Sequence, residues 1–414
     1  MPTDDFLLGL RADGDPDAGE DLHEAVRGSP PRTAADVLRV LRKPAADQPQ
    51  WLGELLDKWV QAGPSLPPWA NPELIERGQR FFNDWDLAIC TALFTACLPS
   101  AYAGRQGVLV LARVSQLAEP GTVARRIAET GQMLLEITKP GALERGGTGY
   151  KRIVLVRVLH EAVREVLLSK DPPGGVWPAA DGVPVNQEDL LATLMTFTII
   201  VFRALDRMGI KVAPADQEAY LHLWAVVGDL LGITEAKLLC QPRDADDLTT
   251  MFQQSLQGPS KDGAYLMSIL LRELELAMPL GWLRVPRTVV RFLIGDQIAN
   301  MIEVPDAAWW SPALPAAAAL NRWLHGYTVT RHISELPSQL VGRRIIQLWI
   351  DQNRRGERHP FSITPDQARR WRLAEDGRAV TTIRRRLRTR RQRLRQAHLP
   401  VPRRVSPADP SMWP

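Results

Sequence analysis

Cysteine is scarce in this 414-residue chain, which has three: Cys90, Cys97 and Cys240. An odd number in apolar surroundings argues against a disulfide framework and suits a reducing compartment. Their spacing matches neither the Cys-x-x-Cys of zinc and redox sites nor the Cys-x-x-Cys-His that attaches haem covalently. We therefore interpret all three as small core residues.

Long apolar runs are also missing. The two longest, 87–98 and 190–202, are well short of the ~20 residues that a helix needs to cross a bilayer. Residues 1–5 (MPTDD) are acidic where an export signal would be basic. We therefore predict that the chain is not exported and lies in the cytoplasm.

The composition, 45% hydrophobic and 24% charged, is that of a globular protein and excludes a disordered or fibrous one. The net charge of +4 is uneven: eight arginines lie between Arg384 and Arg395, and without them the chain carries about −4. We interpret this arginine-rich tail as a solvated helix face. A surface for an anionic membrane or an acidic partner is the alternative. Nucleic-acid binding is not expected, because no aromatic residue interleaves the arginines.

Apolar residues recur at three- and four-residue spacing from residue 51 to about 340, and strand-like alternation is lacking. This pattern predicts an all-α fold with one main domain. We expect a polar, loosely packed N-terminal extension (1–45), a helical domain (46–340) and a C-terminal helical extension with the arginine-rich tail (341–414). The predicted helices span 50–62, 72–98, 105–115, 121–138, 149–169, 187–208, 215–231, 234–240, 244–257, 261–278, 286–302 and 314–325.

Common catalytic motifs do not occur in the sequence. There is no Gly-x-Ser-x-Gly elbow of the α/β-hydrolases and no His-Glu-x-x-His zinc motif. The glycine run at 146–149 follows no predicted strand and matches neither a P-loop nor a dinucleotide fingerprint. These catalytic schemes therefore find little support in the sequence.

The predicted helix 149–169 carries His160 between Arg157 and Arg164, and these spacings place all three on one apolar face. Such a triplet is costly to bury unless something anionic or metallic meets it. Neutral imidazole commonly ligates haem iron, and arginine pairs well with carboxylates such as haem propionates. The alternative is a histidine hydrogen-bonded to a carbonyl group, with both arginines paired to acidic residues.

Three further features have simpler readings. Arg126, Glu129 and Thr130 share one face of the predicted helix 121–138, but Glu129 could equally form a surface ion pair with the arginine four residues before it, worth only ~0.3–0.5 kcal/mol. Asn186 is a natural N-cap for the helix that follows it. His222, among apolar neighbours, is interpreted as a core histidine with satisfied hydrogen bonds.

Taken in order, several motifs resemble those of the latex clearing protein family and its MpaB-type oxygenase relatives, helical proteins that hold non-covalent haem b. The resemblance covers roughly residues 75 to 305. It rests on Leu98-Pro99-x-x-Tyr102-Ala103, Arg126-x-x-Glu129-Thr130, Gly146-Gly147-x-Gly149, Arg157-x-x-His160-x-x-x-Arg164, Pro184-x-Asn186-Gln187-Glu188-Asp189, Trp224-x-x-x-Gly228-x-x-x-Gly232, and Pro286-Arg287 with Arg291 and Gly295.

The resemblance implies a globin-like haem-binding core in which His160 is the proximal iron ligand. It places Arg126 and Thr130 on the distal side, where O2 and a lipophilic substrate would meet. Residues expected next to the haem or its propionates are Arg157, Arg164, Arg287 and Arg291.

Two departures from the family pattern matter. Glu129 stands where latex clearing proteins have a lysine, and it could serve as a general base. The expected lack of export argues against extracellular polyisoprene as the substrate and favours a smaller, terpenoid-like one. Two other functions stay open: a haem-binding sensor or carrier without oxygenase activity, and a haem-free helical interaction protein.

Overall fold

The computed structural model describes residues 4–18, 34, 37, 50–62, 65–116, 122–169, 176–277 and 284–325. The arginine-rich tail, and with it the whole predicted extension 341–414, lies outside the described residues. Within the described part of the chain the regular elements are all helical, and the only pairing of the β type is one isolated bridge between Gly104 and Gln257. The all-α prediction is confirmed.

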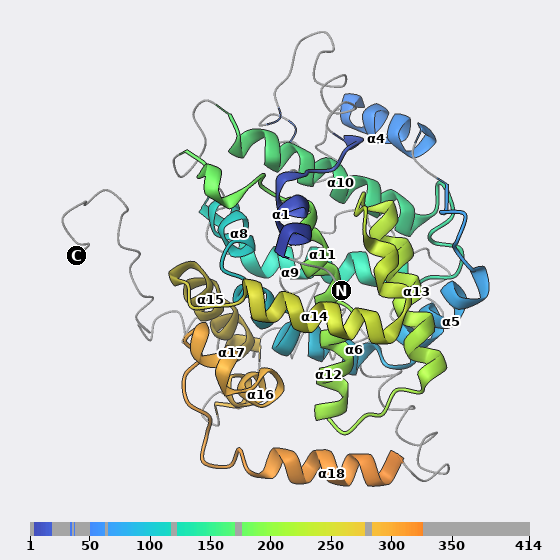
Figure 1. Cartoon of the computed structure of the whole chain (residues 1–414). Coiled ribbons are helices and arrows are strands. Elements are labelled where there is room, and N and C mark those ends of the chain that lie inside the picture. The colour runs from blue at the N-terminus through green and yellow to red at the C-terminus, as the bar shows by residue number, and fades with distance from the viewer. Residues whose placement is uncertain are drawn as a thin grey trace, which may run out of the picture.

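The helices follow one another along the chain as shown in Figure 1. They are α1 (Asp4–Ala12), α4 (Gln50–Ala62), α5 (Pro72–Asp84), α6 (Asp86–Ala92), the π-helical turn η2 (Leu93–Cys97), α7 (Leu98–Tyr102), α8 (Gly107–Gln116), α9 (Thr122–Ile137), α10 (Thr148–Leu167), η3 (Ala179–Asp181), α11 (Gln187–Thr196), α12 (Ile199–Arg207), α13 (Pro214–Leu230), η4 (Ala236–Cys240), α14 (Pro242–Leu256), α15 (Lys261–Ala277), α16 (Val285–Ile294), α17 (Asp296–Met301) and α18 (Ala313–His325).

Helix α13 forms the centre of the core. It is apolar on nearly all sides and buried over most of its length, packing on α5 and η4. A Cβ atom at Gly78 of α5 would lie 2.5 Å from the carbonyl oxygen of Ala219, so glycine lets the two helices touch. Trp224 is buried in the same helix and stacks on Phe197, with ring centroids 4.8 Å apart. Large aromatic groups thus fill the space between α13 and its neighbours.

Three predicted helices are interrupted in the structure. Helix 72–98 bends by 83° between α5 and the segment Asp86–Tyr102. Helix 187–208 breaks between α11 and α12, and helix 286–302 breaks at Gly295, whose φ of +81° favours glycine. Among the described helices none is by itself long and apolar enough to cross a membrane; the bent pair α5 and Asp86–Tyr102 meets the length and composition criteria only jointly.

The N-terminal segment 4–18 packs more tightly than the sequence predicts. Helix α1 lies across α11 in the upper half of Figure 1 and buries Leu7 and Leu10. Arg11 forms a buried ion pair with Glu188 at the start of α11. The expectation of a loosely packed extension is therefore wrong for these residues. The polar average of the first 45 residues hides a short amphipathic helix with two leucines that dock on the domain.

Candidate functional site

The candidate site is built on α10, the long helix across the top of Figure 1. Its first turn abuts α9, because a Cβ atom at Gly149 would lie 2.8 Å from the Cα of Ile137. Arg152 of α10 also pairs with Glu136 of α9 at 2.6 Å, and the pair is mostly buried. These contacts fix the helix that carries His160, as the sequence predicts, with Arg157 and Arg164 on the same face.

His160 has a ring nitrogen without a partner. The residue as a whole is partly accessible, but its Nδ1 atom is buried and makes no hydrogen bond with any residue that the structure describes. Burial and, to a lesser degree, the positive charge of Arg164 lower the pKa of His160 to about 4. The imidazole is therefore neutral at physiological pH and keeps a lone pair, which is the form that binds a metal ion.

His222 provides the internal comparison. Its Nε2 accepts a hydrogen bond from the backbone N–H of Asn71 at 2.8 Å, and its Nδ1 lies 3.9 Å from the sulfur of Cys240. Trp69 meets the ring edge-on, with centroids 5.7 Å apart. The prediction that His222 is a core histidine with satisfied hydrogen bonds is confirmed, and the contrast sets His160 apart.

Arg157 is held by the N-terminal segment. Its Nε donates to Oδ2 of Asp15 at 2.7 Å and its Nη2 donates to Oδ1 at 2.6 Å, a bidentate pair that is almost fully buried. The same Oδ1 accepts from the backbone N–H groups of Asp17 and Ala18, which fixes the carboxylate. The exposed carboxylate of Asp17 lies farther away, 3.7 Å from Nη2 of Arg157.

Arg164 is held by its own helix and by the loop before α11. It donates to the carboxylate of Glu161 and to the carbonyl oxygens of Pro184 at 3.1 Å and Val185 at 2.7 Å. Val185 has a φ of +55°, a strained conformation for a β-branched residue. The haem-free alternative predicts acidic partners for both arginines, but it does not predict an Nδ1 atom of His160 that lacks a partner in the described part of the chain. The haem-adjacent roles of Arg157 and Arg164 stay predictions.

The motif at 184–189 joins this site to the rest of the domain. Gln187 donates from Nε2 to the carbonyl oxygens of Gly14 at 2.8 Å and Gly232 at 2.9 Å. Gly232 has a φ of +80°, and a Cβ atom there would lie 2.3 Å from Oδ2 of Asp15. Asn186 caps α11 as predicted, accepting from the N–H of Asp189 at 2.8 Å. Three motifs that are distant in sequence therefore converge around Asp15 and Arg157.

Gln187 and Asp15 are the contributors that sequence reasoning missed. Gln187 belongs to a motif that we interpreted as a helix start and as part of the family resemblance, but its side-chain amide gives no local signal of a tertiary role. Asp15 lies 142 residues before its partner Arg157. Nothing in the spacing of a polar N-terminal segment indicates so distant an ion pair.

The remaining predicted site residues lie on helices α9 and α16. Arg126 and Glu129 lie on α9, but their side chains fall outside the described part of the structure, and Thr130 is exposed on the same helix. Arg287 pairs with Glu275 at 2.6 Å, and Arg291 donates to Asn300 at 2.7 Å. Their helix, α16, lies well below α10 in Figure 1. These partners of Arg287 and Arg291 do not include His160, and the roles of all five residues stay predictions.

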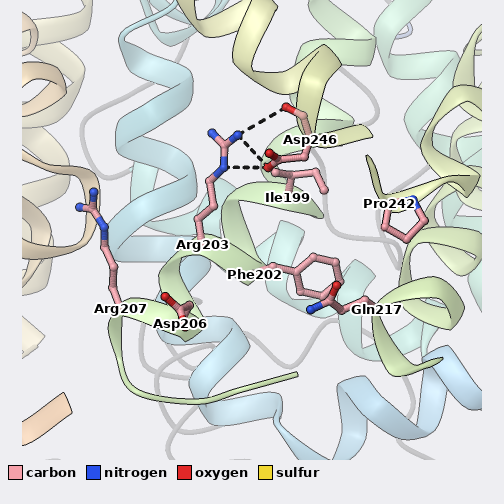
Figure 2. A pocket seen from close by; sticks show the side chains of 8 residues that line it. All are labelled: Ile199, Phe202, Arg203, Asp206, Arg207, Gln217, Pro242 and Asp246. Atoms are coloured by element: carbon pink, nitrogen blue, oxygen red, sulfur yellow. Dashed lines mark hydrogen bonds and ion pairs between the residues drawn. The ribbon is translucent and has the colours of Figure 1, made fainter. Parts of the chain in front are cut away.

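A pocket lies between α12, α13 and the start of α14. It has a volume of about 410 Å³ and is drawn in Figure 2. Nη2 of Arg203 forms an ion pair with Oδ1 of Asp246 at 2.8 Å, and Arg207 donates to the carbonyl oxygen of Phe292. Because its arginines are already engaged by protein acceptors, we assign no chemistry to this pocket.

The chain is similar in sequence and in structure to known proteins. Residues 80–331 match the family model described as ER-bound oxygenase mpaB/B′/rubber oxygenase, catalytic domain. The rubber oxygenase of Streptomyces sp. (strain K30) is 23% identical over 256 residues, which are 60% of this chain and 60% of that protein, so the chain spans less than two thirds of that relative's length. The solved structure of a latex clearing protein in the closed state is similar with a TM-score of 0.60 and 21% identity, covering 82% of this chain and 91% of that one. This likeness supports the all-α fold.

Proposed function

Because the chain belongs to the family of ER-bound oxygenase mpaB/B′ and rubber oxygenase catalytic domains, we propose that it is a haem b-dependent oxygenase. Its reaction uses O2 to cleave or oxygenate a lipophilic alkene of isoprenoid type. The family is one of oxygenases; the haem and the substrate class are the proposal. The observation that carries it is the buried Nδ1 atom of His160, which has no hydrogen-bond partner among the described residues.

The residues on α10 fit a haem. A porphyrin supplies four ligands to its iron, so the protein needs to add one neutral imidazole from a rigid element. His160 is neutral at physiological pH and lies on a helix that contacts both α9 and the N-terminal segment. Its Nδ1 atom has no hydrogen-bond partner among the described residues. The chemistry that the haem would supply when bound is the activation of O2.

Each predicted residue has a distinct task in this proposal. His160 holds the iron, and Arg157 and Arg164 shape the charge around the imidazole. Arg126 and Thr130 supply hydrogen-bond donors for negative charge that develops during the reaction. Arg287 and Arg291 are candidates for propionate contacts. The helical interior excludes water and takes up a lipophilic substrate.

The function is tested by supplying the haem-loaded, reduced chain with O2 and a series of isoprenoid alkenes. We expect O2 uptake matched by an oxygenated or cleaved product in the mass spectrum, and none in matched anaerobic samples. A chain that binds haem and O2 but turns over none of these alkenes would instead be a sensor or a carrier.

Glu129→Gln is expected to lower turnover by about 10²–10⁴-fold, because glutamine cannot accept a proton from the substrate. The visible spectrum of the haem should stay the same, since the variant keeps His160 as the proposed iron ligand. Glu144→Gln, at an exposed turn before α10, is the matched control and should leave turnover unchanged. Full activity in Glu129→Gln would remove the general-base role.

A further inference from the structure

The positive charge of Arg157, close to His160 on α10, is balanced by a residue that lies outside the segment matched by the family model. Asp15 belongs to the N-terminal segment, whereas that match begins at residue 80. The Asp15 carboxylate accepts two short hydrogen bonds from Arg157, and both side chains are nearly inaccessible to water. Arg157 is one helical turn from His160. A buried negative charge is thus fixed close to the imidazole.

Several contacts hold Asp15 in this position. Its own turn is closed by the N–H groups of Asp17 and Ala18. Gln187 binds the carbonyl oxygen of the preceding Gly14, and the lack of a side chain at Gly232 leaves room for the ion pair. Contacts from α11 and from the turn after α13 therefore hold one carboxylate beside α10. Packing of α1 alone does not require them.

We propose that Asp15 is a positioning residue that sets the reduction potential of the haem by neutralising Arg157 beside the iron ligand. The inference rests on the proposed function, in which His160 binds haem iron. An uncompensated positive charge near the iron favours the ferrous state, which carries one positive charge less. An uncompensated carboxylate favours the ferric state. Because both groups are shielded from water, solvent weakens these effects little.

The test is a spectroelectrochemical titration of the full-length, haem-loaded chain and three variants. In Asp15→Asn we expect the ferrous-to-ferric ratio at a fixed potential to rise on the order of tenfold, which is a shift of about +59 mV for one electron. Arg157→Gln should shift the potential in the opposite direction, because it leaves Asp15 unpaired. The double variant Asp15→Asn/Arg157→Gln should return to near the wild-type value.

Asp17→Asn is the control, because Asp17 lies in the same segment but is exposed and farther from Arg157. It should leave the potential unchanged. A loss of packing would move both single variants in the same direction, so opposite shifts cannot come from a structural role alone. Should Asp15→Asn fail to fold, Arg157→Gln and the double variant still decide the matter.

The outcomes separate the two claims. Equal potentials in wild type and in the variants that bind haem would overturn the role of Asp15 and leave the haem proposal intact. A wild-type chain that retains no haem absorption after haem is added and the unbound haem is removed would overturn the proposed function, and this inference with it.

Discussion

Replacing Arg164 by alanine should lower the free energy of unfolding by about 3–5 kcal/mol, the usual cost of removing one partner from a buried ion pair. The side chains of Arg164 and Glu161 are 7% and 6% exposed. Without the guanidinium, the Glu161 carboxylate is left buried without its partner, and the carbonyl oxygens of Pro184 and Val185 lose their donor. The strained loop before α11 is then held less firmly. Urea unfolding followed by circular dichroism measures the change.

Arg80→Ala is the matched control for this prediction. Arg80 also pairs with a glutamate on its own helix, Glu76, but the two side chains are 59% and 63% exposed. Water and salt screen such a pair, so its loss should change stability by no more than about 0.5 kcal/mol. Arg164→Lys should recover only part of the stability, because lysine cannot reach three acceptors with a planar fork. Similar losses in Arg164→Ala and Arg80→Ala would show that the buried arginine does not organise this site.

His160→Ala should weaken haem binding by more than 100-fold, since even the loss of a group that supports a metal ligand costs about 10–100-fold. His222→Ala is the comparison, because both histidines lie within helices, but His222 already has protein partners. We expect His222→Ala to bind haem as the wild type does and to lose about 1 kcal/mol of stability with its hydrogen bond. Fluorescence quenching during haem titration gives both affinities. Equal affinities in the two variants would place the iron elsewhere.

Sequence periodicity predicts most of the helices well. Helix α15 spans Lys261–Ala277 where 261–278 was predicted, and α4 spans Gln50–Ala62 as predicted. Their ends coincide with prolines, glycines and changes in polarity, which are local signals. The breaks at Trp85 and between α11 and α12 were not predicted, because apolar residues recur at helical spacing on both sides of them and tertiary packing decides the bend. Helix α1 was missed for a related reason: its stability comes from docking on α11.

In the candidate site, too, local spacing predicts some features and tertiary packing decides the others. The shared face of Arg157, His160 and Arg164 follows from helical spacing alone, and the structure confirms it. The partners of the two arginines could not be predicted, because Asp15 and the carbonyl groups of Pro184 and Val185 are brought in by the chain's path through space. That Nδ1 of His160 has no partner among the described residues is likewise a property of the packed structure that no spacing reveals.

The most direct test of the account is the visible absorption spectrum of the purified chain, oxidised and reduced, beside His160→Gly with and without added imidazole. We predict a Soret band that shifts on reduction in the wild type, its loss in His160→Gly, and its return when free imidazole fills the space that the side chain leaves. A wild-type chain that keeps no Soret band once unbound haem has been removed, or a His160→Gly spectrum identical to that of the wild type, would contradict the claim that His160 binds haem iron.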